Sequence, residues 1–328
     1  MNAEIKKIRV FNSVRRVEGE SSYSNSMFHL MKRNEEIGFN GILFFENHSN
    51  DIDPWVFAQE LFARTQKQSP FIAVNPAYIH PYSAALKILS LTNLYKRKLY
   101  LNFIIGTSKS DLLSIGDKLP HSERYERLKE YIQILSGLLK ADRMFNFEGR
   151  FYTIRHARLP LGLDINYFPE FFISGSSSEA DTVREMTGSG KIVMAKPLGK
   201  CIDFRSKGLC CGIIARANEP DAKEYLTENY RPIYAEYKEL VDFSLNNSDA
   251  VWKQELIKET NDGTFYSEPF KHFISDSPYL VGSYLSVADY ICKYIGFGID
   301  TFIIESDDNE LEHIAKVFDI VEQKSNIN

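Results

Sequence analysis

The residues best suited to chemistry are Gly175-Ser176-Ser177-Ser178, which follow a β-branched and aromatic run and precede a helical pattern. A glycine turn at a strand end lets the backbone approach a ligand, and the helix start after it offers unpaired N–H groups and a positive dipole end. The serine hydroxyls add hydrogen-bonding groups. The segment Glu170–Ala180 therefore predicts a phosphate-binding site. For this segment alone, an ordinary capped junction between a strand and a helix is the alternative.

The composition excludes several classes of protein. The chain has 328 residues, of which 44% are hydrophobic, enough for a large core, and its net charge of -5 argues against nucleic acid as a partner. It has no apolar run of about 18 residues and no leader pattern, so we expect no membrane partner and a cytoplasmic location. The four cysteines, Cys201, Cys210, Cys211 and Cys292, do not have the C-x-x-C spacing of metal-binding sites. We therefore expect free thiols and no metal site.

Several familiar motifs are absent. The segment Thr187–Val193 (TGSGKIV) is not a Walker A loop, because Glu185 stands at the position of the first glycine and no Ser or Thr follows Lys191. No G-x-G-x-x-G follows the first predicted strand, which disfavours a Rossmann site. The chain also lacks H-E-x-x-H and G-x-S-x-G. Hydrolase and metalloenzyme functions are therefore disfavoured.

Short β-rich runs alternate with amphipathic helical patterns, the signature of repeated βα units around a parallel sheet. The number of predicted strands suggests a closed barrel, with strands at Ile8–Val14, Gly41–Phe45, Phe71–Asn75, Leu99–Ile105, Glu170–Ser174, Lys191–Ala195, Gly208–Ala215 and Asp300–Glu305. Helical periodicity is clearest at Arg124–Lys140. Further helices are predicted at Met27–Ile37, Pro54–Thr65, Tyr82–Leu94, Glu179–Met186, Asp221–Val241, Ser286–Ile295 and Glu310–Gln323.

Three segments break this rhythm. Met144–Leu163 is polar and aromatic, which predicts a short hairpin, and Asn246–Tyr279 is long and weakly periodic, which favours a lid or insertion. The connection between the sixth and seventh strands, PLGKCIDFRSKG, is too short for a regular crossover helix. We therefore expect the barrel to be irregular or partly open at the sixth βα unit.

Taken in order, several phrases resemble the bacterial luciferase-like flavin-dependent monooxygenase family, especially its alkanesulfonate monooxygenase branch. They cover most of the chain, and their order and spacing make the resemblance specific. The phrases are EEIGFNGILFFENHSNDIDPW, FIAVNPAYIHPYSAA, LYLNFIIG, HSERYERLKEYIQIL, FNFEGRFYTI, FFISGSSSEA and LVGSYLSVADYICKYIGFGIDTFII.

The resemblance implies one luciferase-like barrel domain over residues 1–328, an α/β fold of the (β/α)8 TIM-barrel type with insertions, including 246–279. It also implies that FMN binds at the carboxyl ends of the strands. The residues that would hold FMN are Asn75, Asn102, His121, Tyr125, Gly175, Ser176 and Ser177. Plainer alternatives remain for three of them, because Tyr125 also lies on the apolar stripe of its helix, His121 could be a surface residue and Asn75 could form a turn. A buried Asn102 without a partner would be costly.

The chain departs from the alkanesulfonate branch where that branch handles substrate. Cys210 and Gly212 stand where the branch has an arginine and a histidine, and Asp51 replaces a cysteine. The acidic run Glu305–Asn309 replaces a Ser-Gly-Tyr-Pro-His run. A sulfonate would meet carboxylates where it needs cations, so we do not expect an alkanesulfonate substrate. By position, the pocket candidates are Asp51, Cys210 and Asp308, with Cys210 expected to be an inert thiol.

The resemblance favours a flavin-dependent oxidoreductase. The leading hypothesis is a two-component monooxygenase that uses reduced FMN from a separate flavin reductase, together with O2, on a small organic or biosynthetic-intermediate substrate. One alternative is a reductase or dehydrogenase on the same scaffold, with FMN or the deazaflavin F420. A second alternative is a non-catalytic flavin-binding protein or partner subunit. The resemblance also suggests a homodimer.

Overall fold

The computed structural model describes residues 8–14, 23–46, 52–199, 206–232 and 237–325. The chain divides into two compact units. Unit 1 comprises Met1–Ile42, Ile192–Asn246 and Ala250–Asn328, and unit 2 comprises Leu43–Lys191 and Asn247–Asp249. Within the described residues, no helix has the length and apolar character needed to cross a membrane.

Eight parallel strands close into a ring, because β8 pairs with β9 and β12 pairs with β1. This confirms the predicted (β/α)8 barrel. The strands, in ring order, are β1 (Arg9–Ser13), β2 (Gly41–Phe44), β3 (Phe71–Val74), β4 (Tyr100–Phe103), β7 (Glu170–Ser174), β8 (Gly190–Met194), β9 (Ser206–Arg216) and β12 (Thr301–Glu305). All eight overlap the strands expected from the sequence.

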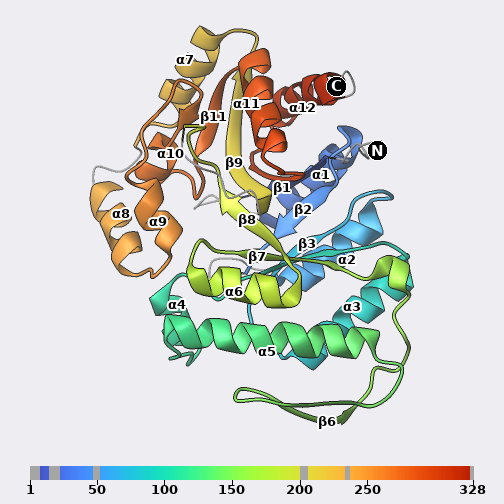
Figure 1. The fold of residues 1–328 in the computed structure, drawn as a ribbon. Coiled ribbons are helices and arrows are strands. Elements are labelled where there is room, and N and C mark those ends of the chain that lie inside the picture. Colours follow the sequence, from blue (N-terminus) through green and yellow to red (C-terminus); the bar gives the residue numbers. More distant parts are fainter. Residues whose placement is uncertain (1–7, 15–22, 47–51, 200–205, 233–236, 326–328) are drawn as a thin grey trace. The chain divides into compact units, whose positions relative to one another are not determined.

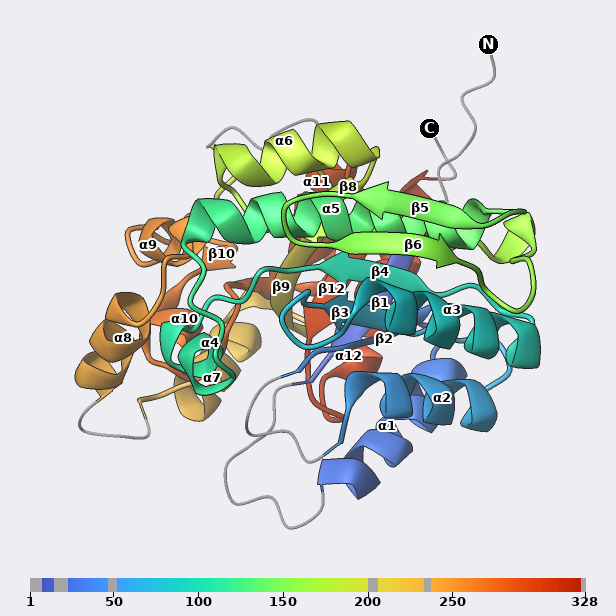
Figure 2. The ribbon, with the colours of Figure 1, turned by 90° about the horizontal axis from the view of Figure 1, so that it is seen from below.

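In unit 2, helix α5 (His121–Lys140) packs against α3 (Pro81–Tyr95) and α6 (Ser178–Thr187), as Figures 1 and 2 show. The predicted apolar stripe of α5 is buried, including Leu128 and Leu135. This unit also contains α2 (Pro54–Arg64), α4 (Lys109–Ser114) and the 3-10 turn η1 (Ile165–Tyr167).

The segment after α5 forms the predicted hairpin. Its strands β5 (Phe145–Glu148) and β6 (Thr153–Ala157) pair antiparallel as a separate two-stranded sheet. Figure 2 shows the hairpin beside α5 in unit 2. Its tip supplies Phe151 and Tyr152 to a pocket described below.

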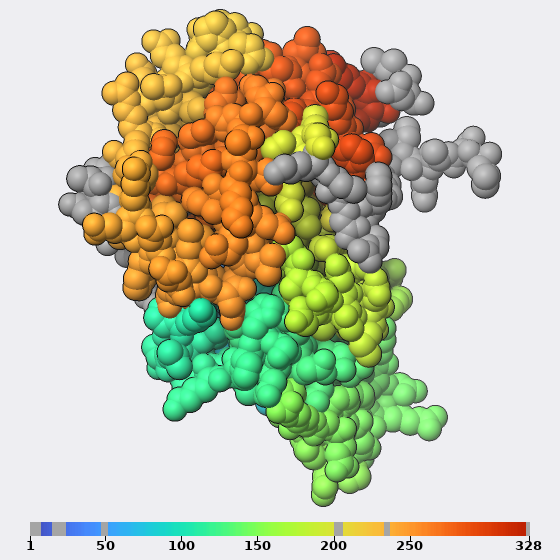
Figure 3. Space-filling view, turned by 60° about the vertical axis from the view of Figure 1, so that its left-hand side comes forward, coloured from blue at the N-terminus to red at the C-terminus, as the bar shows by residue number. Residues whose placement is uncertain are grey.

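In unit 1, α11 (Tyr284–Gly296) and α12 (Leu311–Ser325) pack together, as Figure 1 shows, and α1 (Tyr23–Glu36) follows β1. The long strand β9 pairs with β12 through its first half and with β11 (Tyr279–Ser283) through its second half. The remaining elements of this unit are α7 (Glu219–Asn229), α8 (Tyr237–Asn246), α9 (Val251–Leu256), β10 (Phe265–Tyr266) and α10 (Glu268–Lys271). Orange residues from α9 to α10 form a continuous part of the surface in Figure 3.

Three expectations about unit 1 need correction. The single helix predicted over Asp221–Val241 is wrong: α7 ends at Asn229, and Pro232, which lacks an N–H donor, lies before α8. The partly open barrel is also wrong, because Ala195 N–H donates to Cys210 O at 2.9 Å and the β8–β9 pairing closes the ring. The irregularity lies in the connection, where the described residues 195–199 contain no helix. Strand β11 was not predicted.

Candidate functional site

Gly175 is required by the geometry of the predicted phosphate site. Its φ of 152° is positive, and a Cβ added there would lie 2.6 Å from the Tyr125 hydroxyl and 3.0 Å from Ala180 Cβ. Tyr125 is buried on α5, as its place on the apolar stripe predicts. A glycine after β7 therefore lets a buried phenol lie directly against the backbone that leads into α6.

Two serines complete the start of α6. Ser177 is the N-cap residue, and its hydroxyl accepts a hydrogen bond from Ala180 N–H at 3.3 Å and lies within reach of the Tyr125 hydroxyl. Ser176 Oγ is buried and has no hydrogen-bond partner within the described residues. A buried hydroxyl without a partner is unfavourable unless a ligand satisfies it. The orphaned Ser176 hydroxyl, the glycine turn and the helix N-terminus together fit a phosphate group.

His121 and Glu179 lie beside the same helix start. His121 begins α5, and its ring contacts Tyr125 edge-on, with ring centroids 5.1 Å apart. The pKa of Glu179 is lowered, chiefly because its carboxylate accepts a hydrogen bond from its own backbone N–H and also interacts with the Ser177 hydroxyl. Glu179 thus places an anion where the dipole of α6 favours one. A bound phosphate would have to displace or tolerate this carboxylate.

Asn102 and Asn75 lie on neighbouring strands. Asn102, in β4, is 5% exposed and accepts a hydrogen bond from Ser174 Oγ at 2.9 Å, so its buried amide has a structural partner next to Gly175. Asn75 follows β3 and accepts from Ala77 N–H at 3.0 Å, which is the turn role that the sequence left open. Ala73 pairs with Asn102 across the β3–β4 ladder. The alternation of a strand then places Asn75 on the same face as Asn102.

Five of the seven predicted cofactor residues therefore meet at the starts of α5 and α6: His121, Tyr125, Gly175, Ser176 and Ser177. Asn102 is linked to this group by its hydrogen bond with Ser174, which precedes Gly175. Asn75 lies on the neighbouring strand segment, two residues after Ala73, which pairs with Asn102.

Arg124 is a structural residue of this region that the sequence did not reveal. It is 2% exposed and donates from Nη1 to Ile105 O at 3.1 Å and to Gly106 O at 2.7 Å, while Nη2 pairs with Asp249. An arginine inside the apolar stripe of α5 was the available signal. Arg124 ties the loop after β4 to the first residues of the predicted lid.

Asn247 strengthens this attachment. Its side-chain oxygen accepts from Ser110 N–H at 3.0 Å, and its amide group donates to Ser110 Oγ at 2.8 Å. Lys109 N–H donates to Asn247 O at 2.8 Å. The segment Asn247–Asp249 is therefore fixed to α4 and to the loop before it.

In unit 1, the space beside Gly212 is filled by an aromatic ring. A Cβ at Gly212 would lie 2.2 Å from the Tyr279 ring, and Gly212 pairs with Tyr279 on one side and with Glu305 on the other. Tyr230 donates to the Tyr279 hydroxyl at 3.4 Å, and their ring centroids are 5.0 Å apart. The space beside Gly212 is thus filled by the buried Tyr279, with the half-buried Tyr230 against it, a pairing that the sequence did not indicate.

The three pocket candidates have different surroundings. Burial, with a smaller effect of Glu305, raises the pKa of Cys210 to about 12, so its thiol stays protonated. Asp308 is 47% exposed and pairs with His29 at 3.7 Å and with Arg33 at 3.6 Å, which gives it a structural explanation. We therefore do not carry Asp308 into the site. Asp51 lies outside the described residues.

Charged groups at the ends of β9 and β12 are held by partners in unit 1. Arg216 donates two hydrogen bonds to the Glu310 carboxylate, at 2.8 and 2.9 Å, and its guanidinium lies 3.9 Å from the centre of the Tyr225 ring. Burial raises the pKa of Asp307 above its usual range. Among the described residues, no group of three or more His, Cys, Asp or Glu side chains could hold a metal ion.

Comparison with known proteins defines the family. The model of the luciferase-like monooxygenases matches residues 10–198, more than half of the chain. The chain therefore belongs to the luciferase-like monooxygenase family of enzymes.

A curated relative and two solved structures illustrate the range of similar proteins. The 4-(gamma-L-glutamylamino)butanoyl-[BtrI acyl-carrier protein] monooxygenase BtrO of Niallia circulans is 28% identical over 319 residues, which cover 93% of each protein. The long-chain alkane monooxygenase LadA has the same fold, with a TM-score of 0.77, 14% identity and coverage of 97% of this chain and 92% of that chain. An F420-dependent secondary alcohol dehydrogenase in complex with an F420-acetone adduct also shares it, with a TM-score of 0.67, 15% identity and coverage of 96% and 98%.

Proposed function

We propose that this protein is a two-component monooxygenase that takes reduced FMN from a separate flavin reductase and uses it with O2 to oxygenate a small organic substrate. The observation that carries the proposal is the orphaned Ser176 hydroxyl beside Gly175 at the start of α6. Ser176, Ser177 and the first N–H groups of α6 would hold the flavin phosphate, and Tyr125 would line the same site. When bound, the reduced flavin would supply the reaction with O2.

The other residues of unit 2 would orient the flavin and keep water out. Ser174 fixes the oxygen of the Asn102 amide, which orients the amide NH2 group for a flavin acceptor. Arg124 and Asn247 hold the loop after β4 and Asn247–Asp249 together, and we propose that residues 246–279 act as a lid tethered at this point.

We infer that the substrate is an acyl compound, such as a biosynthetic intermediate, and not an alkanesulfonate. The similar enzyme of Niallia circulans is named for a butanoyl substrate on an acyl-carrier protein. In unit 1, Gly212 pairs with Tyr279 on one strand and with Glu305 on the other, so this part of the sheet contains a phenol and a carboxylate. A sulfonate would be repelled by Glu305, and Arg216 is already paired with Glu310.

The proposal is tested with the purified protein and reduced FMN. We expect anaerobic titration to show saturable binding of reduced FMN that weakens in Ser176→Ala. On admission of O2, an acyl thioester should be oxygenated only when protein and reduced FMN are both present. Failure of the wild-type protein to bind FMN in either redox state would contradict the proposal.

A flavin- or F420-dependent reductase or dehydrogenase is the second candidate, favoured by the shared fold of the F420-dependent alcohol dehydrogenase. Parallel titrations with FMN and reduced F420 separate the cofactors, and product formed under strict anaerobiosis would identify a reductase. Binding of FMN without turnover of any substrate would instead favour a partner subunit. We also propose a homodimer, which light scattering of the purified chain tests.

A further inference from the structure

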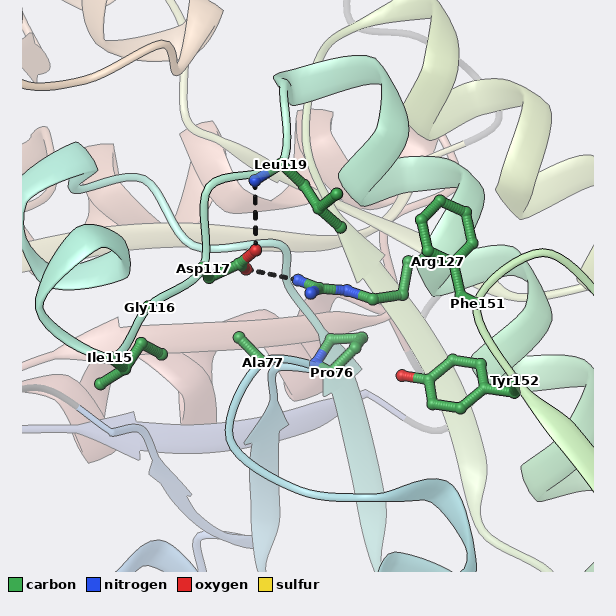
Figure 4. A pocket seen from close by; sticks show the side chains of 9 residues that line it. All are labelled: Pro76, Ala77, Ile115, Gly116, Asp117, Leu119, Arg127, Phe151 and Tyr152. Carbon is green, nitrogen blue, oxygen red and sulfur yellow. Dashed lines mark hydrogen bonds and ion pairs between the residues drawn. The ribbon is translucent and has the colours of Figure 1, made fainter.

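A pocket in unit 2 is lined by residues outside the predicted cofactor set. It is an open pocket with a volume of about 400 Å³, within the usual range for small-molecule sites, and is lined by Pro76, Ala77, Ile115, Gly116, Asp117, Leu119, Arg127, Phe151 and Tyr152. Figure 4 shows that these residues come from the turn after β3, the loop after α4, helix α5 and the hairpin tip. The pocket begins directly after Asn75.

The walls of this pocket are held in place by hydrogen bonds. Asn75 fixes Ala77 by accepting from its N–H at 3.0 Å. On the opposite side, the Glu130 carboxylate accepts from the backbone N–H groups of three successive residues at the hairpin tip, at 2.8, 2.9 and 3.2 Å. Gly149 allows this approach, because a Cβ there would lie 2.5 Å from the Glu130 carboxylate. The pocket is thus formed before a ligand arrives.

Hydrogen-bond donors are available in the pocket. Arg127 Nη2 donates to Asp117 Oδ2 at 2.6 Å, and Leu119 N–H donates to the other oxygen of Asp117 at 3.3 Å, as Figure 4 shows. The Arg127 Nε group is buried without a partner, and the described residues offer no hydrogen-bond partner to the Tyr152 hydroxyl. Burial raises the pKa of Tyr152 to about 12, so this hydroxyl keeps its proton.

These features select one class of ligand. The unused Tyr152 hydroxyl calls for an oxygen acceptor, and the flanking side chains of Pro76, Ile115 and Leu119 suit a slender chain. Asp117 offsets the charge of Arg127, so an anion gains little over a neutral carbonyl oxygen. A ligand carbonyl that accepts a hydrogen bond from the Tyr152 hydroxyl would satisfy this donor without adding a charge to the pocket.

We propose that this pocket binds the neutral, amide- or ester-bearing tail of an acyl substrate. The inference rests on the proposed oxygenation of an acyl compound. Pro76 and Ala77 directly follow Asn75. If the tail of the substrate binds here, the reacting end of the substrate would therefore point toward the strand ends that carry Asn75 and Asn102.

Pantetheine, an uncharged chain with two amides, serves as the probe, with binding measured by calorimetry on the full-length protein. We expect saturable binding to the wild type. Tyr152→Phe should weaken it about 3- to 10-fold through loss of one hydrogen bond, and Ala77→Leu should abolish it by filling the cavity. Arg155→Gln, a change at an exposed residue of β6, is the matched control and should bind like the wild type.

Three outcomes overturn the proposal: no pantetheine binding by the wild type, equal binding by Ala77→Leu with an unchanged melting temperature, or tighter binding of acetate than of pantetheine. The affinity for FMN is measured on the same samples. FMN binding without pantetheine binding overturns the pocket assignment and leaves the flavin function standing. Pantetheine binding without FMN binding contradicts the proposed function instead.

Discussion

In unit 2, Gly175 leaves room for the Tyr125 hydroxyl, whereas in unit 1, Gly212 leaves room for the Tyr279 ring. Both glycines follow or lie within barrel strands, and in both a Cβ would collide with a buried tyrosine. The results differ, because the space near Gly175 contains the unpartnered Ser176 hydroxyl, whereas the space at Gly212 is filled by a paired phenol. The polar group beside Gly175 is therefore left without a partner, whereas the hydroxyl beside Gly212 has one.

Substitution of Gly175 should produce the largest effect. In Gly175→Ala, the Cβ meets the Tyr125 hydroxyl and the positive φ becomes strained, so we expect the Kd for FMN, measured by fluorescence quenching, to rise by about 30-fold or more. Gly188→Ala is the control, since Gly188 ends α6 with a φ of 68° and has open space around it. It should lower stability by about 1 kcal/mol without changing the Kd. Equal FMN binding by both variants would contradict the site.

Substitution of Gly212 should affect stability and spare the flavin. In Gly212→Ala, overpacking against Tyr279 should lower the free energy of unfolding by about 1–3 kcal/mol, measured by urea denaturation, with the Kd for FMN unchanged. Gly296→Ala, in the last turn of α11 with no atom near its Cβ position, is the control. If Gly212→Ala loses FMN affinity while Gly296→Ala does not, Gly212 also serves flavin binding, and the proposed difference between Gly175 and Gly212 is wrong.

Ser176→Ala separates ligand binding from folding. Removal of a buried hydroxyl without a partner should leave thermal stability unchanged or slightly raised, while the Kd for FMN rises about 5- to 10-fold. Thr182→Ala removes an exposed hydroxyl of α6 that donates to Ser178 O and serves as the matched control. If Ser176→Ala loses stability and keeps its FMN affinity, Ser176 is a packing residue.

Glu179→Gln should have the smallest effect, and in the opposite direction. Loss of a carboxylate at the start of α6 should tighten FMN binding about 2- to 5-fold, because the phosphate no longer meets a like charge. The lowered pKa of Glu179 keeps its carboxylate ionised, so the difference from the wild type should stay constant above about pH 7, where the FMN phosphate is also fully ionised. Glu185→Gln, near the other end of α6, should show no tightening.

Local sequence patterns predicted the elements that depend on local chemistry. The strand and helix around Gly175–Ser178 appeared as expected, because a strand run, a glycine turn and an N-cap serine act within a few residues. The single helix predicted over Asp221–Val241 is wrong, because Pro232 lacks the N–H that a continuous helix needs, and local periodicity does not report this break. Strand β11 was missed because its pairing with β9 is a long-range contact.

The sequence by itself determined the barrel and the family, and it predicted the strand, turn and helix around Gly175–Ser178, since these signals are short in range and keep their order along the chain. Only the tertiary structure decided what lies beside each glycine. Tyr125 is 50 residues from Gly175 and Tyr279 is 67 residues from Gly212, so no local pattern connects them. It also brought Arg127, Tyr152 and the turn after Asn75 into one pocket. Space and unsatisfied hydrogen bonds are properties of packing, and they appear only when distant segments meet.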